Sequence, residues 1–386
     1  MPETATPPWA ALAPNQQETL ARHVQILRER LLRTGGAMPF AEFMDMALYD
    51  PQIGYYAHET VFGGHGDFVT APTLSPLFGQ CVARQCAQIL RETPGVLVEA
   101  GGGTGRLAVD MLRTLESLEA LPSRYVLIER SARRREEART LIGRELPDLA
   151  GRILVTDTWP AVTASVIVAN ELLDALPAER FRVHGGQAHP LSVGADDEGL
   201  GWRVGAADAR LTDDLATAGW PEGYTSEISW NARRWVADAA SHVCEGGLLL
   251  LVDYGFPATE YYHPQRADGT LMCHFRHHAH SDPLILPGLQ DITVHVDFTA
   301  MADAGRAAGL ALAGYTSQAG FLLSLGIAPR TLDFDRAHRE DVAAIKRLTL
   351  PHEMGELFKV MALTRGETRP LAGFHLLDRR AALGRR

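Results

Sequence analysis

Short apolar runs alternate with more polar stretches through the middle of the chain. The runs are almost entirely Val, Ile and Leu, which predicts buried strands. The stretches before and between the early runs have helical character, and the first carries Leu20, Val24, Leu27 and Leu31 at three- and four-residue spacing. The expected strands are 96–100, 125–129, 153–156, 166–169, 248–253, 310–315 and 358–363, and the expected helices are 16–33, 77–91, 107–118 and 133–144.

This alternation predicts an α/β fold with a doubly wound, largely parallel sheet that is covered on both faces. It breaks at about 180–228, where an antiparallel insertion is expected, and at about 255–297, where an irregular insertion is expected. Residues 38–79 are dense in Gly, Pro and aromatics, which predicts a loop-rich segment. The expected domains are an N-terminal helical and loop segment that covers the site, 1–80, a core with both insertions, 81–365, and a C-terminal tail, 366–386.

A glycine-rich turn follows the first expected strand. Glu99, Gly101, Gly103 and Gly105 form the pattern acid-x-Gly-x-Gly-x-Gly directly before a helix, which is typical of a nucleotide-binding corner. A dinucleotide site requires G-x-G-x-x-G, and Arg106 stands where the third glycine belongs. The pattern resembles motif I of class I S-adenosyl-L-methionine (SAM)-dependent methyltransferases, with Glu99 near the amino-acid end of SAM. A tight turn without a ligand is the alternative.

Acidic residues also follow the second and third expected strands. Ligands of open α/β sheets bind outside the carboxyl ends of the strands, so these acids are candidates for cofactor contacts. Glu129 is placed to accept hydrogen bonds from both ribose hydroxyls, although an acid there can also stabilise a helix N-terminus. Asp157 is the candidate for the adenine amino group.

The fourth expected strand ends in Asn170 and Glu171, with Asp174 three residues later. Methyl transfer from a sulfonium requires the nucleophile to be held about 3 Å from the methyl carbon, in line with the breaking bond. A carboxylate suits a guanidinium acceptor because the bidentate pair fixes both orientation and charge. We predict that Glu171 orients the acceptor and helps its proton to leave, supported by Asp174. The alternative is that Asn170 and Asp174 only cap the following turn.

Charge and cysteine usage exclude several classes of protein. The net charge is −10 and the longest basic run is the three arginines 133–135, so a nucleic-acid substrate is not expected. The four cysteines form no C-x-x-C pair, which indicates reduced thiols. We see no signal-peptide or transit-peptide pattern and no apolar run of ~18 residues, and therefore expect a cytoplasmic protein without a membrane span.

The segment 273–282 contains a cysteine and four histidines. Their spacing matches no standard zinc pattern, and neighbouring histidines cannot all face one ion. We therefore expect no metal site. A mixed surface loop is expected instead, in which one or two histidines between His274 and His280 face the cleft and could accept a proton.

Seven groups of residues together resemble the MidA-like family of SAM-dependent methyltransferases, which includes the mitochondrial complex I assembly-factor protein arginine methyltransferase. They follow the family's order over roughly residues 35–365, so the resemblance covers most of the chain. The combination of the Gly-Asp-Phe segment with the Asn-Glu block is more specific than motif I alone. The groups are Gly66-Asp67-Phe68-Val69-Thr70-Ala71-Pro72, residues 98–107, Asn170-Glu171-Leu172-Leu173-Asp174-Ala175-Leu176-Pro177, Gly246-Gly247 with Asp253-Tyr254-Gly255, Asp282-Pro283-Leu284 with Pro287-Gly288, Asp291-Ile292-Thr293 with Val296-Asp297-Phe298, and Met354-Gly355-Glu356.

The resemblance implies a Rossmann-like class I methyltransferase sheet with a helical N-terminal part and inserted substrate-side elements. It implies SAM as methyl donor and S-adenosyl-L-homocysteine (SAH) as product. For the mitochondrial branch it implies symmetric dimethylation of an arginine on a respiratory complex I subunit. The residues to which it assigns SAM binding are Glu99, Gly101, Gly103, Gly105, Glu129, Asp67 and Thr70.

We therefore predict a SAM-dependent methyltransferase that acts on a protein arginine, with Asn170, Glu171 and Asp174 as the catalytic group. The expected partner is a protein substrate, for which a complex I subunit is a candidate, and a homodimer is a candidate assembly. Three alternatives stay open: a small-molecule methyltransferase, an NAD-dependent oxidoreductase, and a non-catalytic assembly partner on the same fold.

Overall fold

The chain folds into two compact units. The structure is a computed structural model that describes residues 12–58, 70–197, 199–215, 220–329, 336–367 and 369–384. Unit 1 comprises Met1–Val69, Ala175–Asn231 and Glu260–His295, and unit 2 comprises Thr70–Asp174, Ala232–Thr259 and Val296–Arg386. The glycine turn and Asn170, Glu171 and Asp174 all belong to unit 2.

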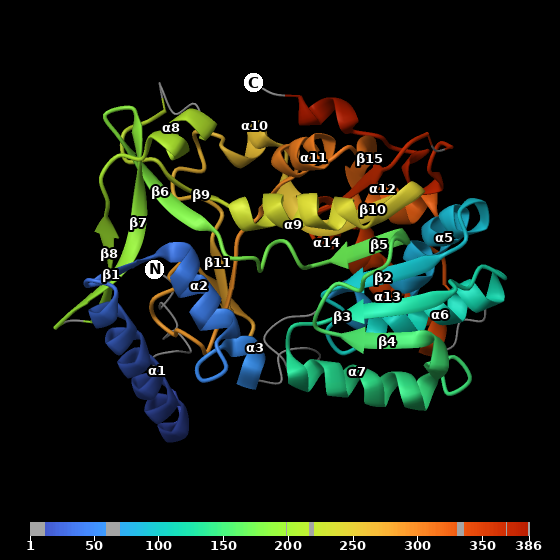
Figure 1. Ribbon diagram of the computed structural model, residues 1–386, viewed down its shortest axis with the longest axis horizontal. Helices are drawn as coiled ribbons and strands as arrows, with labels where there is room; N and C mark the ends of the chain where they lie inside the picture. The colour runs from blue at the N-terminus through green and yellow to red at the C-terminus, as the bar shows by residue number, and fades with distance from the viewer. Residues whose placement is uncertain are drawn as a thin grey trace. The chain divides into compact units, whose positions relative to one another are not determined.

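Unit 2 is built around a mixed sheet of eight strands. Its strands are β2 (Val96–Ala100), β3 (Arg124–Ile128), β4 (Ile153–Thr156), β5 (Ala164–Asn170), β10 (Val243–Phe256), β14 (Val296–Asp297), β15 (Ala311–Ser317) and β16 (Phe358–Thr364). The order across the sheet is β15-β16-β10-β5-β2-β3-β4, and β14 pairs with β10. Figure 1 shows β5, β2, β3 and β4 side by side in that order.

The predicted α/β fold with a doubly wound sheet is confirmed. Each expected strand overlaps one of these strands, and β4, β3, β2, β5 and β10 pair in parallel. The exception is β16, which runs antiparallel to both β10 and β15. A single antiparallel strand in an otherwise parallel sheet is common in α/β folds.

Both faces of this sheet are buried. Along β10, Leu248, Leu250 and Val252 belong to a core that also contains helix residues, while Leu249 and Leu251 on the opposite face are equally buried. No helix in the described ranges is long and apolar enough to cross a membrane. The helices described in unit 2 are α4 (Ala71–Leu74), α5 (Pro76–Glu92), α6 (Arg106–Ser117), α7 (Ala132–Glu145), α11 (Phe298–Ala307), α12 (Gln318–Ser324), α13 (Arg336–Thr349), α14 (Met354–Leu357) and the 3-10 helices η2 (Ala150–Arg152), η3 (Ala372–Phe374) and η4 (Arg380–Leu383).

Unit 1 contains two antiparallel sheets. Its elements are α1 (Pro14–Arg33), β1 (Ala37–Pro39), α2 (Phe40–Tyr49), α3 (Tyr55–His58), β6 (Glu179–His184), β7 (Gln187–Asp196), β8 (Gly199–Val204), α8 (Ala209–Leu215), β9 (Thr225–Ile228), β11 (Met272–Phe275), β12 (His278–His280) and β13 (Asp291–Thr293). One sheet has the order β1-β7-β6-β9 with β8 paired to β7, and the other has the order β12-β11-β13. Two further helices, α9 (Trp230–Ser241) and α10 (Ala258–Tyr261), each cross a boundary between the units.

Helix α2 lies in the segment that was expected to be loop-rich. Its buried residues are Phe40, Phe43, Met44, Ala47 and Leu48, which recur at three- and four-residue spacing. That spacing is the signal for a helix, and the Gly- and Pro-rich sequence on either side of it obscured the pattern. The expectation of a loop is therefore wrong for these residues.

A buried ion pair joins two strands of unit 1. Arg180 of β6 and Glu227 of β9 are register partners, and Arg180 Nε lies 3.2 Å from Glu227 Oε1. Glu227 Oε2 also accepts the backbone N–H of Thr270 at 2.7 Å and its hydroxyl at 3.1 Å. Burial raises the pKa of Glu227, while Arg180 opposes this shift. Such a pair is costly to break, because the partner that remains is a buried charge without compensation.

We expect Glu227→Ala to lower the free energy of unfolding by about 3–5 kcal/mol. Asp196→Ala provides the control, because it breaks the exposed pair of Asp196 with Arg203, and we expect a loss below about 1 kcal/mol. Urea unfolding followed by tryptophan fluorescence measures both changes. Equal losses of unfolding free energy in E227A and D196A would show that the buried Arg180–Glu227 pair is no more costly to break than an exposed pair.

Candidate active site

The candidate site lies where the strand order of unit 2 reverses. From β2 the chain adds β3 and then β4 on one side, and it later adds β5 and β10 on the other side. The carboxyl ends of β2 and β5 are neighbours, with Ala100 opposite Ala169. In open α/β sheets this switch point is where ligands bind.

The glycine turn connects β2 to α6 through three left-handed residues. Gly101, Gly103 and Gly105 have φ values of 73°, 52° and 81°, a region that glycine adopts without the steric cost that other residues incur. The N–H groups of Gly101 and Gly102 both donate to the carbonyl oxygen of Ile128 on β3, at 2.8 and 3.1 Å. The alternate spacing of the glycines in the sequence therefore follows from the backbone conformation of this turn.

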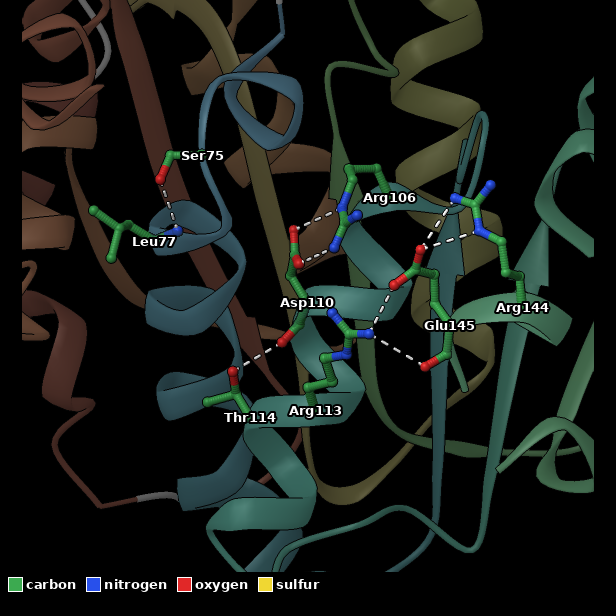
Figure 2. A network of polar contacts seen from close by, with 8 residues as sticks. All are labelled: Ser75, Leu77, Arg106, Asp110, Arg113, Thr114, Arg144 and Glu145. Carbon is green, nitrogen blue, oxygen red and sulfur yellow. Dashed lines mark hydrogen bonds and ion pairs between the residues drawn. The ribbon is translucent and has the colours of Figure 1, made fainter. Parts of the chain in front are cut away.

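Ion pairs hold the helix that follows the turn. Figure 2 shows Arg106, in the first turn of α6, paired with the buried carboxylate of Asp110 one turn later. In the same view, Arg113 and Arg144 converge on Glu145, which ties α6 to the end of α7. Hydrogen bonds from these two arginines lower the pKa of Glu145. The start and the middle of α6 are thus fixed independently of any ligand.

The carboxylate of Glu129 is bonded directly to the glycine turn. Its Oε2 accepts the N–H of Gly103 at 3.0 Å, and its Oε1 accepts the N–H of Ser131, the N-cap of α7, at 2.8 Å. A carboxylate offers about four acceptor sites, so both oxygens retain capacity for hydroxyl groups of a ligand. The structure therefore brings Glu129 to the turn, and its role toward a ribose stays a prediction.

Asp157 lies farther out on the same edge. Its side chain is 54% exposed and pairs with Arg135 Nη2 at 3.1 Å. Arg135 in turn donates to the carbonyl oxygen of Glu129 at 2.8 Å. Asp157 is therefore linked to the surroundings of Glu129 through Arg135, and its predicted contact with adenine remains a prediction.

Glu99 lies in the core of unit 2. It is 3% exposed, and its Oε2 accepts the hydroxyl hydrogen of Tyr125 at 2.7 Å. Burial raises the pKa of Glu99 to about 8; the bond from Tyr125 lowers it, and the nearby carboxylates of Glu129 and Asp110 raise it further. The structure thus adds a buried partner, Tyr125, that the sequence motif does not reveal.

Asn170 ends β5, and Glu171, the next residue, contacts the start of α4. Glu171 Oε1 accepts the backbone N–H of Ala71 and the side-chain N–H of Asn170, both at 3.2 Å. Thr70, the residue before Ala71, is buried and forms the N-cap position of α4. The structure therefore brings together Thr70, Asn170 and Glu171. Asp67 falls outside the described residues.

Two features of this pair are typical of functional sites. Glu171 has a φ of 52°, which is uncommon for a residue other than glycine, and such strained residues cluster at active sites. The Oδ1 atom of Asn170 is buried and accepts no hydrogen bond from the described residues. A buried acceptor without a donor costs about 1–3 kcal/mol, which a donor on a ligand would offset.

The loop that follows Glu171 packs against the glycine turn. A Cβ atom built on Gly101 would lie 3.0 Å from Leu172 Cδ1, so this glycine leaves room for the Leu172 side chain. Asp174 is buried, and its backbone N–H donates to Asp253, three residues before the end of β10. Asp253 carries no predicted role, although it ends the expected strand 248–253, and the rule applied to the other strand ends would have identified it.

The histidine-rich segment forms a hairpin in unit 1. β11 and β12 pair antiparallel, and the two residues between them, Arg276 and His277, have φ values of 49° and 63°. Positive φ at both central residues is the conformation of a type I′ turn. Burial lowers the pKa of His280. A role for this segment in catalysis stays a prediction.

Comparison with a family of known sequences identifies the class of enzyme. The model of a family described as "Putative S-adenosyl-L-methionine-dependent methyltransferase" matches residues 81–316, more than half of the chain. The chain is also similar to a crystal structure from Burkholderia thailandensis of a "likely methyl transferase" bound to S-adenosyl-homocysteine. The two share 38% identity with a TM-score of 0.91, over 96% of this chain and 99% of that chain.

More distant relatives carry a more specific name. The chain is 26% identical to the "Protein arginine methyltransferase NDUFAF7 homolog, mitochondrial" of Drosophila melanogaster, over 90% of this chain and 87% of the relative. It is also 26% identical to "Protein arginine methyltransferase NDUFAF7, mitochondrial" of Danio rerio, over 98% and 97%.

The expected cytoplasmic location is wrong. Both relatives are named as mitochondrial proteins, which contradicts it. The expectation relied on the absence of a signal-peptide or transit-peptide pattern and on the four cysteines, which are free thiols in the structure. Free thiols argue against an oxidising environment, but they do not distinguish one reducing compartment from another.

We expect Glu99→Gln to change how stability depends on pH. The folded-state pKa of Glu99, about 8, lies above its ordinary value of 4.5, so the folded protein binds a proton that the unfolded chain releases. This contribution to stability is fully present below about pH 4.5 and is lost as the pH rises through about 8. Urea unfolding from pH 5 to 9 measures this effect. As the pH rises, the unfolding free energy of wild type should fall relative to that of E99Q. A difference that does not depend on pH would refute the raised pKa.

Proposed function

Because the chain belongs to the family of S-adenosyl-L-methionine-dependent methyltransferases, we propose that it transfers the methyl group of SAM to an arginine side chain of a protein. The observation that carries this proposal is the Asn170–Glu171 pair at the switch point, beside the glycine turn. The names of the Drosophila and Danio relatives support arginine as the acceptor.

The residues around the switch point fit SAM. The turn of Gly101, Gly103 and Gly105 keeps backbone rather than side chains at the edge of β2, which allows a ligand to approach closely. Glu129 would bind the ribose hydroxyls, and Asp157 would lie near the adenine. Thr70, Asp67 and Glu99 complete the group to which we assign SAM binding. The buried Oδ1 of Asn170, which accepts no hydrogen bond from the part of the chain that the structure describes, offers an acceptor to an N–H group of the bound reactants.

SAM supplies a methyl group on a sulfonium, and SAH leaves as that group is transferred. In the transfer, a guanidinium nitrogen forms a bond to the methyl carbon while the carbon–sulfur bond breaks, and the nitrogen loses a proton. Arginine is protonated at any physiological pH, so its positive charge must be held away from the attacking nitrogen. We assign this task to the carboxylate of Glu171, with Asp174 in support and Asn170 as the orienting neighbour. Negative groups at this position also favour binding of a cationic acceptor.

The family resemblance extends the proposal to partners. A subunit of respiratory complex I is the protein that we propose to carry the arginine, and a homodimer is the assembly that we propose. Isotope-labelled methyl groups on a complex I subunit, located by mass spectrometry, would support the first part. Sedimentation velocity of the purified chain tests the second part.

We expect Glu171→Gln to lower kcat for methyl transfer by about 100-fold or more. The neutral amide cannot hold the positive charge of the guanidinium away from the attacking nitrogen, as the carboxylate does. SAH affinity, measured by calorimetry, should change by less than about threefold, because the glycine turn is unaltered. Glu136→Gln is the matched control, since it makes the same chemical change at an exposed site of α7, where the side chain is 73% exposed, and should leave kcat unchanged.

The same assay separates the proposal from its alternatives. Labelled SAM is supplied to protein and metabolite fractions, and the labelled product is hydrolysed to amino acids. Methylarginine in the protein fraction supports the proposal, whereas label in metabolites alone contradicts the substrate class. An E171Q variant that restores full function in cells would favour a non-catalytic role.

We expect Gly103→Ala to weaken SAH binding by about tenfold, because a left-handed conformation costs a residue with a Cβ about 1–2 kcal/mol. Its N–H is also bonded to Glu129, so the ribose site would shift with the turn. Gly143→Ala in α7 is the control, because nothing lies within 4 Å of a Cβ at that position and its φ is not positive. Equal SAH affinity in G103A and wild type would argue against the turn as the cofactor site.

A further inference from the structure

Asp253 gathers the backbone of the loop that carries the catalytic group. Its Oδ2 accepts the N–H groups of Leu172, Leu173 and Asp174 at 3.2, 2.9 and 3.3 Å. Its Oδ1 accepts the N–H of Tyr254 at 2.9 Å. The residue is 1% exposed, so water does not compete for these bonds. One buried carboxylate thus accepts four backbone hydrogen bonds, three of them from consecutive residues.

The loop has a further bond to the same strand. The N–H of Glu171 donates to the carbonyl oxygen of Val252 at 2.8 Å. The N–H groups of residues 171–174 therefore all donate to two adjacent residues of β10. Consecutive N–H groups that converge on one point form a site for an acceptor, and here the side-chain oxygen of Asp253 occupies it.

This arrangement bears directly on Glu171. Its φ of 52° is a conformation that a residue with a Cβ adopts only when its surroundings require it. The N–H of Glu171 donates to Val252, and the next three N–H groups donate to Asp253. These four hydrogen bonds hold Glu171 in that conformation. They fix the direction in which the Glu171 side chain leaves the backbone, at the point where its Oε1 meets the N–H of Ala71.

The carboxylates near Asp253 give this arrangement an electrostatic cost. Burial raises the pKa of Asp253, and the charges of Asp174 and Glu171 raise it further, whereas hydrogen bonds from Leu173 and Tyr254 lower it. A buried acid close to two others destabilises the loop, and only the hydrogen bonds that it accepts offset this cost. An apolar residue at this position of β10 would avoid the cost, but it could not accept the N–H groups of residues 172–174. The role of the acid is therefore to hold the loop.

We propose that Asp253 is a positioning residue for methyl transfer, which acts through Glu171 by holding the backbone of residues 171–174. This inference rests on the proposed function of Glu171 and deepens it. Among the hydrogen bonds of the described residues, none joins Asp253 to the glycine turn or to Glu129, and the loop meets the turn through the side chain of Leu172 beside Gly101. We therefore expect the effect of Asp253 to fall mainly on the acceptor side of the reaction.

The test compares Asp253→Asn with Asp297→Asn. D253N keeps one acceptor oxygen and the size of the side chain, but it places an N–H₂ donor against an N–H group of the backbone. We expect kcat to fall by about 30- to 100-fold, as for a small displacement of a catalytic group, while SAH affinity changes by less than about threefold. D297N makes the same change at the N-cap of α11 in unit 2, where the side chain accepts the N–H of Ala300, and it should lower Tm without lowering kcat.

A double-mutant cycle distinguishes positioning from a general loss of structure. If Asp253 acts through Glu171, D253N adds less than about twofold to the loss of kcat in E171Q. Losses that multiply in the double variant would overturn the proposal. If D253N does not fold, Asp253→Glu takes its place with the same expectations, because it keeps the charge and displaces it by one methylene group.

Hydrogen exchange provides a readout that needs no methyl acceptor. The amides of residues 171–174 should be protected in wild type and should exchange at least about tenfold faster in D253N, while amides of β2 keep their rates. Unchanged protection in D253N would overturn the positioning role. Lost protection together with full activity of E171Q would instead show that the proposed function of Glu171 fails and that Asp253 still holds the loop.

Discussion

The parallel pairing of β2 with β3 on one side and with β5 on the other is the constraint on which the candidate site depends. Parallel strands end at the same edge, so the glycine turn, Glu129 and Asn170 meet there although the chain visits them far apart. The alternate glycines allow the backbone of this edge to turn in a left-handed conformation, and the space left at Gly101 receives Leu172 from the neighbouring loop. The glycine turn and the loop after Glu171 are therefore in contact through the fold itself.

Buried carboxylates are the second common feature of unit 2. Glu99 is held by the hydroxyl of Tyr125, Asp110 by Arg106, and Asp253 by backbone N–H groups. Each acid therefore has a different kind of hydrogen-bond donor. Burial raises the pKa of Glu99 to about 8, and the hydrogen bond from Tyr125 opposes this shift. Burial without such partners favours the neutral form of an acid or destabilises the fold, and Glu99 is mostly protonated at neutral pH because its pKa is raised to about 8. Of the three, Asp253 acts on the backbone, because its oxygens accept the N–H groups of the loop after Glu171.

Much of the fold and part of the candidate site could be predicted from local patterns. Continuous apolar runs marked the strands, and the glycine spacing marked the turn, because both reflect backbone requirements of a few neighbouring residues. Helix α2 was obscured by the Gly and Pro residues beside it, although Phe40, Phe43 and Ala47 have helical spacing. The bonds from Ala71 to Glu171 and from residues 172–174 to Asp253 join segments about 80 to 100 residues apart, so no local pattern could show them. The location was misjudged because reduced thiols occur in several compartments and because the sequence showed no recognisable targeting pattern.

The sequence by itself determined the class of fold, the glycine turn between β2 and α6, and the identity of the acidic residues that follow the strands. These follow from periodicity and from glycine spacing, which are properties of short segments. Only the tertiary structure decided which acids face which partners: Glu99 lies against Tyr125 in the core, Asp157 pairs with Arg135, and Asp253 holds the loop after Glu171. The physical reason is that an acid's role depends on its burial and on the donors that reach it, and both are fixed only when distant strands pair.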